Sequence, residues 1–210
     1  LGLAEASREI HREMERKGLV QLSPPLAPGE DPSPAAEGRV LFGRYRIKGR
    51  VATSPHARLF QAEDTITGRL VAVKTLVVSV AGSGRDAFLR FEREATAMAK
   101  VRHPTIVNLL EYLPDVPAII MEWMSGGSLS TLLEREAFAP ARAIEVAKAI
   151  LTALGEAHRL GILPRDVKPS NVLFDEVGTP KLADFGAAHL GDLSATATAG
   201  AIGTFTYMSP

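Results

Sequence analysis

The order of secondary-structure patterns is the feature that most restricts the fold of this chain. Strand-like alternation occurs first, over residues 44–51, 57–63 and 69–77, with turn-forming pieces between the segments. A helical pattern follows at about 85–100, and two further strand-like segments occupy 106–113 and 117–122. The apolar residues that define this helix are Phe88, Phe91, Ala95 and Met98. Because neighbouring strands are joined by short turns, the sequence predicts a first lobe built from an antiparallel sheet and one helix.

The second half of the chain reads mainly as helix. A short helix is predicted to open at Ser128, which is a suitable N-cap, and a longer one runs from Pro140 to a stop at Gly161. Short strands are predicted at 172–174 and 180–183, joined by a DEVGT turn. The residues predicted to share the apolar face of the longer helix are Ile144, Ala147, Leu151, Leu154 and His158. The fold class is therefore α+β with two lobes, residues 44–122 and 123–210, the second mainly helical.

The first 43 residues differ from the rest. Residues 1–20 carry a helical pattern with one apolar stripe, typical of a solvated helix that packs on a neighbour, although a helix that binds a separate partner fits as well. Residues 21–43 form a predicted extended linker that contains five of the 14 prolines.

Composition excludes several classes of function. Lysine plus arginine and aspartate plus glutamate each number 24, so no overall charge favours nucleic acid or a membrane surface. The chain contains no cysteine, which excludes disulfides, thiolate metal sites and cysteine nucleophiles, and fits a cytoplasmic location. No apolar run has the roughly 20 residues that a membrane helix needs.

The stretch ILPRDVKPSNVLF (162–174) concentrates polar chemistry in one predicted loop. Asp166 can accept a proton from a hydroxyl group, and Lys168 can stabilise a migrating phosphoryl group. Asn171, together with Asp184 further along the chain, offers the oxygen ligands that Mg²⁺ prefers. These residue types match the requirements of phosphoryl transfer, which are positioning and charge stabilisation.

The chain resembles the eukaryotic-type (Hanks-type) serine/threonine protein kinase domain over roughly residues 44–210. The motifs that carry the resemblance, in the order and spacing of the family, are VAVK (71–74), REA (93–95), RHPTIV (102–107), MEWMSGGSL (121–129), RDVKPSN (165–171), DFG (184–186) and GTFTYMSP (203–210). The resemblance implies a two-lobed kinase fold, ATP and Mg²⁺ as cofactors, and proteins as substrates. The motifs stop at Pro210, before the glutamate expected after Ser-Pro, so an incomplete second lobe is expected.

The resemblance also implies a role for each matching residue. Lys74 would contact the ATP phosphates and pair with Glu94, which the helical pattern places on the polar side of its helix. Asp166 would be the catalytic base, and Lys168 would contact the transferred phosphate. Asn171 and Asp184 would bind the metal. The implied nucleotide-binding residues are Val51, Leu59, Ala72, Lys74, Met121, Glu122, Met124, Leu173 and Asp184. Without the family context, Lys74 and Glu94 would be interpreted as ordinary exposed charges.

Two further features bear on substrate and regulation. Lys168, together with Thr204, is the combination that serine/threonine kinases show; related small-molecule phosphotransferases usually lack the segment from DFG to Ser-Pro. Arg165 would pair with a phosphorylated activation loop, in which Thr196 and Thr198 are the expected autophosphorylation sites. The alternative is a flexible loop that is never modified.

The sequence departs from the family at two places within the site. Ala52, Ser54 and Ala57 align with the three glycines of the phosphate loop. Holding such residues at positive φ would cost about 1–2 kcal/mol each, so we expect the loop to take another path and to cover ATP less well. Pro164 replaces a structural histidine, which should loosen the catalytic loop without removing Asp166. A pseudokinase, meaning a nucleotide-binding scaffold without catalysis, is therefore the alternative function.

Overall fold

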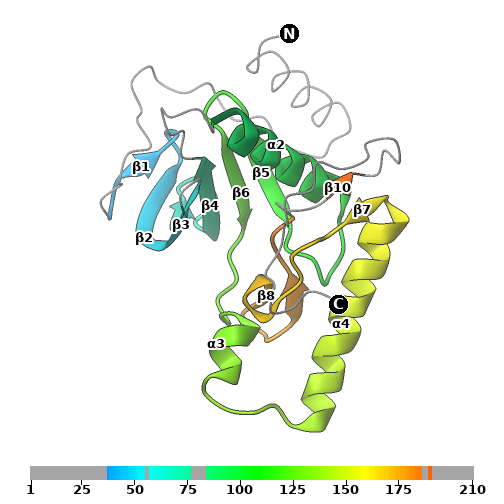
Figure 1. The fold of residues 1–210 in the computed structure, drawn as a ribbon. Helices are drawn as coiled ribbons and strands as arrows, with labels where there is room; N and C mark the ends of the chain where they lie inside the picture. The colour runs from blue at the N-terminus through cyan, green and yellow to red at the C-terminus, as the bar shows by residue number, and fades with distance from the viewer. Residues whose placement is uncertain (1–36, 55–56, 77–83, 186–188, 191–210) are drawn as a thin grey trace. The chain divides into compact units, whose positions relative to one another are not determined.

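The computed structural model describes residues 37–54, 57–76, 84–185 and 189–190, which are coloured in Figure 1. They fall into two compact units. The first contains the described residues up to Glu92 together with Leu109–Trp123, and the second contains Arg93–Asn108 and the described residues from Met124 onward. The predicted N-terminal helix and most of the predicted linker lie outside the described residues.

The first unit is built on one six-stranded sheet. Its strands are β1 (Val40–Leu41), β2 (Tyr45–Thr53), β3 (Ala57–Asp64), β4 (Leu70–Leu76), β5 (Leu109–Leu113) and β6 (Ala118–Glu122). The spatial order is β1-β2-β3-β4-β6-β5, and every neighbouring pair is antiparallel. The predicted antiparallel sheet is confirmed. Two boundaries differ from the prediction, because β1 lies in the predicted linker and β5 begins at Leu109 rather than at residue 106.

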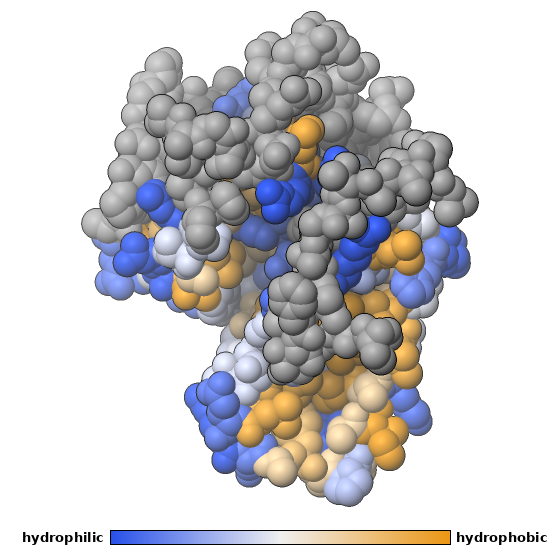
Figure 2. Space-filling model, viewed as in Figure 1, coloured by the Kyte–Doolittle hydropathy of each residue, from blue (hydrophilic) through white to orange (hydrophobic). Residues whose placement is uncertain are grey.

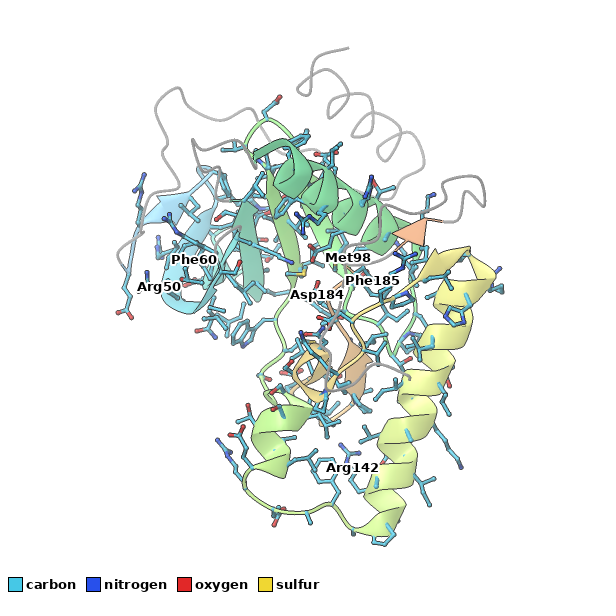
Figure 3. The ribbon with its side chains drawn as sticks, in the orientation of Figure 1. Arg50, Phe60, Met98, Arg142, Asp184 and Phe185 are labelled. Carbon is cyan, nitrogen blue, oxygen red and sulfur yellow. The ribbon has the colours of Figure 1, made fainter. Side chains whose placement is uncertain are left out.

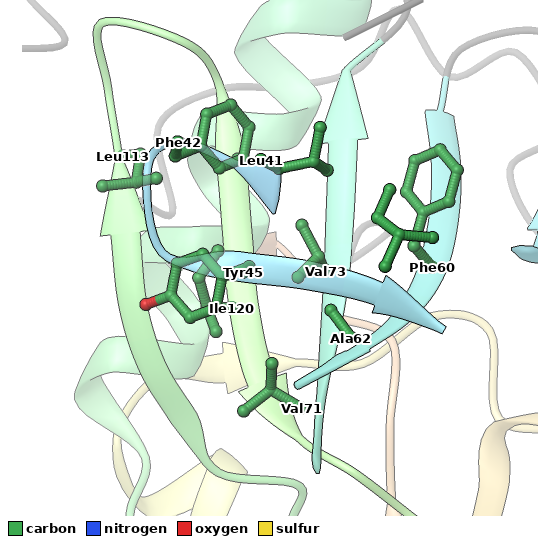
Figure 4. Close-up of a cluster of buried hydrophobic side chains, with 11 residues drawn as sticks. Leu41, Phe42, Tyr45, Phe60, Ala62, Val71, Val73, Leu113 and Ile120 are labelled. Carbon is green, nitrogen blue, oxygen red and sulfur yellow. The ribbon is translucent and has the colours of Figure 1, made fainter. Parts of the chain in front are cut away.

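The hydrophobic core of the first unit lies on one face of this sheet, as Figure 4 shows. Alternation along β4 directs Val71 and Val73 into this core, where they join Phe60, Ala62 and Ile120 from the neighbouring strands. Each large apolar side chain buried in this way contributes about 1.5–3 kcal/mol to stability. The burial fixes the register, because a slip by one residue would turn these side chains toward the opposite face.

A buried polar network joins β2, β3 and β5 at one end of the sheet. Arg44 Nε and Nη2 donate to the two carboxylate oxygens of Asp64 at 2.8 and 2.9 Å, and Nη1 donates to Glu111 at 3.4 Å. The Tyr45 hydroxyl donates to the same Glu111 oxygen, and Thr67 donates to Asp64 at 2.7 Å. Because the side chains of Asp64 and Glu111 are 6% and 2% exposed, Arg44 compensates two carboxylates that are almost removed from water.

Thr75 is a buried polar residue that lacks such compensation. It lies on β4 and is 2% exposed, and its hydroxyl has no hydrogen-bond partner within the described part of the chain. We expect Thr75→Val to raise the free energy of unfolding by about 1 kcal/mol, since the shape is kept and an unpaired hydroxyl is removed. Thermal unfolding checks this, with Thr67→Val as the matched control. That control should lower stability because the Thr67 hydroxyl is bonded to Asp64.

The second unit combines helices with short strand pairs. Its elements are the C-terminal part of α2 (Gly84–Lys100), α3 (Leu129–Leu133), α4 (Pro140–Arg159), β7 (Ile162–Leu163), the 3₁₀ turn η1 (Pro169–Asn171), β8 (Val172–Phe174), β9 (Pro180–Leu182) and β10 (His189–Leu190). The strands form two antiparallel pairs, β8 with β9 and β7 with β10. Ser128 caps α3 as predicted, because its side chain accepts a hydrogen bond from the Thr131 N–H.

The prediction of which α4 residues form its buried apolar face is wrong. Within the described structure, Ile144 and Leu151 are 55% and 67% exposed, and the buried residues of the helix are Val146, Ala153 and Ala157. The two alanines are small enough to let the helix axis approach β7 and β9, on which α4 packs. The larger aliphatic side chains stay exposed. Figure 2 shows that apolar residues form part of the surface of this unit.

None of the described helices is both long enough and apolar enough to cross a membrane.

Candidate active site

The face of the first unit's sheet opposite its hydrophobic core carries several of the predicted nucleotide-binding residues. Leu59 on β3 is the direct cross-strand partner of Lys74 on β4, and Ala72 is the partner of Met121 on β6. Directly opposed residues of an antiparallel pair lie on the same face, and alternate residues along one strand share a face. The structure therefore brings Leu59, Ala72, Lys74 and Met121 together on one surface. Ala72 is buried, and Lys74 is half-buried.

The hairpin that should cover the phosphates avoids the conformation for which the family uses glycine. β2 extends as far as Thr53, with Ala52 paired to Leu59, and β3 resumes at Ala57. Among the described non-glycine residues, only Phe42 and Asp184 have positive φ. Ala52, Ser54 and Ala57 therefore do not carry the strain of the left-handed region. That the loop follows a different path and covers ATP less well stays a prediction. Val51, at the base of the hairpin tip, is 49% exposed.

The loop of residues 165–171 in the second unit brings three predicted site residues into direct contact. Lys168 Nζ donates to Asp166 Oδ2 at 2.6 Å. Asn171 Nδ2 donates to the Asp166 backbone oxygen at 2.8 Å and to Oδ2 at 3.3 Å. The turn η1 creates this arrangement, because the Asn171 N–H bonds to the Lys168 oxygen at 2.9 Å. A charge-assisted bond and an amide together fix the Asp166 carboxylate.

Asn171 and Asp184 are suited to hold a hard cation. The side-chain nitrogen of Asn171 is committed to Asp166, which orients the carbonyl oxygen of the same amide away from that contact. The Ala183 N–H donates to the Asn171 backbone oxygen at 2.8 Å, so the residue adjacent to Asp184 is tied to Asn171. The described residues contain no group of three or more His, Cys, Asp or Glu side chains that could by itself hold a metal ion. Two oxygen ligands completed by substrate phosphates are the arrangement that Mg²⁺ favours.

Asp184 itself has an unusual backbone. Its φ is +61°, which is rare outside glycine, and its side chain is exposed. The next residue, Phe185, is fully buried, and Figure 3 labels both. The anchored phenylalanine fixes the chain beside the aspartate. Strain of this kind costs about 1–3 kcal/mol and is concentrated at functional sites.

The segment that follows the predicted adenine-binding residues, at Gly126 and Gly127, is hydrogen-bonded to strand β8. The Gly126 N–H donates to the Phe174 oxygen at 2.8 Å, and the Phe174 N–H donates to the Gly127 oxygen at 2.9 Å. Ser128 forms a further bridge to Leu173. Leu173, a predicted nucleotide contact, thus lies on a strand held between this segment and β9. Sequence reasoning missed this role of Gly126, and the Gly-Gly pair inside MEWMSGGSL was the available signal.

Gly126 should tolerate no side chain. A Cβ atom built there would lie 2.7 Å from the Phe174 Cβ and 2.8 Å from the Asp175 oxygen. We expect Gly126→Ala to lower the free energy of unfolding by about 1–3 kcal/mol, because the segment around Gly126 must move away from Phe174 and Asp175. Denaturant unfolding checks this, with Gly155→Ala on α4 as the control. A Cβ at Gly155 meets open space, so that variant should be stabilised; equal effects would contradict the argument.

The remaining predicted residues have separate outcomes. Glu94 is 3% exposed, so it is not the solvated helix charge that it would be taken for without the family context. Its pairing with Lys74 stays a prediction, because Lys74 belongs to the first unit and Glu94 to the second. Arg165 is exposed and Pro164 is half-buried. Thr196 and Thr198 lie outside the described residues.

Three predicted adenine-binding residues follow one another along the chain. Met121 and Glu122 end β6 in the first unit, and Met124, which is 8% exposed, begins the next part of the second unit. Their roles in nucleotide binding stay predictions.

Comparisons with known proteins agree with this geometry. Residues 50–210 match the protein kinase domain. A probable serine/threonine-protein kinase of Streptomyces coelicolor is 40% identical over 186 residues, covering 83% of this chain and 27% of the relative. PknL of Mycobacterium bovis is 35% identical, covering 83% and 44%, and PrkC of Bacillus subtilis is 33% identical, covering 82% and 27%. The chain thus spans less than half the length of each of these relatives. Motifs, geometry and similarity lead to one conclusion: the chain belongs to the protein kinase family.

Proposed function

We propose that this protein transfers the γ-phosphoryl group of ATP to serine or threonine hydroxyls of protein substrates, with Mg²⁺ as cofactor. The observation that carries the proposal is the Asp166 carboxylate, held by Lys168 and Asn171. Such contacts position a base and place a positive charge beside it, which is what phosphoryl transfer requires of a protein. The names of the relatives as serine/threonine kinases support the choice of acceptor.

In this proposal each residue of the catalytic loop has one task. Asp166 orients the acceptor hydroxyl and takes its proton. The acceptor oxygen forms a bond to the γ-phosphorus, the bond from that phosphorus to the β,γ-bridging oxygen breaks, and ADP leaves. Lys168 stabilises the charge on the transferred group. Asn171 and Asp184 would hold Mg²⁺, which when bound neutralises charge on the phosphates.

The first unit would bind the rest of the nucleotide. Lys74 contacts the α- and β-phosphates in this proposal. The surface formed by Leu59, Ala72 and Met121 packs against the adenine ring. Apolar residues with one cation beside them fit a nucleotide whose base is apolar on its faces and whose phosphates are anionic.

Transfer of labelled phosphate from ATP to a generic protein substrate tests this function. We expect Mg²⁺-dependent labelling that appears on serine or threonine, and loss of labelling both on chelation of the metal and in Asp184→Asn. Labelling on tyrosine alone, or equal labelling by the protein and by Asp184→Asn, would contradict the proposal.

A nucleotide-binding scaffold without catalysis is the second candidate. The observation that favours it is the hairpin tip, where no glycine is present and where Ser54 and Ala57 are hydrogen-bonded to each other. Pro164 in place of the structural histidine supports it as well. ATP binding without any transfer of label would establish this second function in place of the first.

Regulation by phosphorylation forms part of the proposal. Arg165 is exposed beside Asp166, where it can pair with a phosphate group. We propose Thr196 and Thr198 as the autophosphorylation sites. Mapping phosphopeptides after incubation with ATP tests this, and finding neither residue modified would contradict it.

A further inference from the structure

We propose that Ser54 lowers the affinity of this kinase for the phosphates of ATP, because its hydroxyl occupies a backbone N–H that a glycine-containing phosphate loop would offer to the nucleotide. The inference rests on the proposed function and identifies one residue that sets the nucleotide affinity of the same site.

Three hydrogen bonds join Ser54 and Ala57 across the tip of the β2–β3 hairpin. The Ser54 N–H donates to the Ala57 oxygen at 2.8 Å. The Ala57 N–H donates to Ser54 Oγ at 2.9 Å, and the Ser54 hydroxyl lies 3.1 Å from the Ala57 oxygen, to which it donates. The backbone N–H groups of both residues are therefore already bonded within the hairpin. A glycine at position 54 would have no hydroxyl and would leave the Ala57 N–H available.

The tip is attached directly to the strand surface that carries Lys74. Thr53 pairs with Arg58 and Ala52 pairs with Leu59, so β2 and β3 stay in register next to the tip. Leu59 in turn is the cross-strand partner of Lys74. Pro55 has no backbone N–H, so it adds no donor between Ser54 and Ala57. The Ala57 N–H thus lies two residues along β3 from Leu59, near the surface proposed to bind the nucleotide.

A phosphate oxygen can take the Ala57 N–H only by displacing the Ser54 hydroxyl. The phosphate would gain a hydrogen bond to a charged acceptor, and the hairpin would lose a neutral one. Since a neutral hydrogen bond has a modest net value, its loss should weaken ATP binding by about 2- to 10-fold. Adenosine has no phosphate and should be insensitive to this bond.

Binding measurements on Ser54→Ala test the inference. We expect ATP, titrated in the presence of Mg²⁺, to bind about 2- to 10-fold more tightly to Ser54→Ala than to the unmodified protein, and adenosine to bind equally to both. Thr53→Ala is the matched control. It removes a hydroxyl from the neighbouring exposed position and should leave the affinities for both ligands unchanged.

Hydrogen exchange at the Ala57 amide gives a second readout that does not depend on nucleotide. We expect the Ala57 amide to exchange faster in Ser54→Ala than in the unmodified protein. Equal exchange would overturn the inference, and so would equal or weaker ATP binding by Ser54→Ala, or a change in adenosine affinity as large as the change for ATP. If the unmodified protein did not bind ATP at all, the proposed function would be contradicted, and the inference would fail with it.

Discussion

Replacing Asp166 with asparagine is expected to slow phosphoryl transfer by about 10²- to 10⁴-fold, the range associated with the loss of a general base. The substitution keeps the size of the side chain and its ability to bond to Lys168 through oxygen, but it removes the group that accepts the proton. Because the nucleotide contacts of the proposal lie on other residues, the affinity for ATP should change little. The effect should therefore fall on kcat rather than on KM for ATP.

Single-turnover kinetics with labelled ATP measure this directly. Glu176→Gln is the matched control, because it neutralises an exposed carboxylate in the β8–β9 turn of the same unit and should leave the rate unchanged. If Asp166→Asn retained the full rate, Asp166 would not be the base. If it lost ATP binding instead, the residue would act on the nucleotide rather than on the acceptor.

Replacing Arg44 with methionine is expected to lower the free energy of unfolding by about 3–5 kcal/mol. The methionine keeps much of the apolar stem but leaves Asp64 and Glu111 without their shared cation. Since both carboxylates are nearly inaccessible to water, neither can recover its lost interaction by hydration. Urea unfolding monitored by circular dichroism measures the change.

Lys48→Met is the control for Arg44→Met. Lys48 on β2 pairs with Glu63 on β3 at 2.5 Å, but the two side chains are 42% and 27% exposed. Water and salt screen such a pair, so the unfolding midpoint should barely move. Equal losses in the two variants would show that burial of the Arg44 network is not the cause.

The Arg44 network also predicts how stability depends on pH. The hydrogen bond from Arg44 holds the pKa of Asp64 well below its ordinary value. A carboxyl whose folded pKa is lowered contributes stability above its unfolded pKa of about 4, and this contribution is lost as the pH falls further. The difference in stability between the unmodified protein and Arg44→Met should therefore shrink below about pH 4. A constant difference across that range would contradict the assignment.

Much of the first unit could be predicted because its strands follow a simple rule. Alternation in RLVAVKTLV separates Val71 and Val73 from Ala72 and Lys74, and the structure places these pairs on opposite faces of β4. The contacts among Asp166, Lys168 and Asn171 were also foreseeable, because the three residues lie within one short loop. In both cases the residues concerned lie within a few positions of one another in the sequence.

The features that could not be predicted depend on contacts between distant segments. Glu94 sits among charged neighbours in the sequence, yet packing around α2 buries it. The apolar periodicity of α4 selected Leu151 and left out Ala153, whereas the structure buries Ala153 and leaves Leu151 67% exposed. β1 and β7 have only two residues each, and strands that short have no periodicity to detect.

The left-handed backbone of Asp184 determines which substitutions could silence this protein without unfolding it. Aspartate, asparagine and glycine are the residues that accept such a φ most readily. Substitution by asparagine or glycine would therefore remove the carboxylate proposed to bind Mg²⁺ while the fold stays intact. Glutamate would preserve the charge but would fit the backbone less well. The backbone conformation at this position can therefore be kept while the carboxylate is lost. A single codon change would separate an active protein from a folded but inactive one.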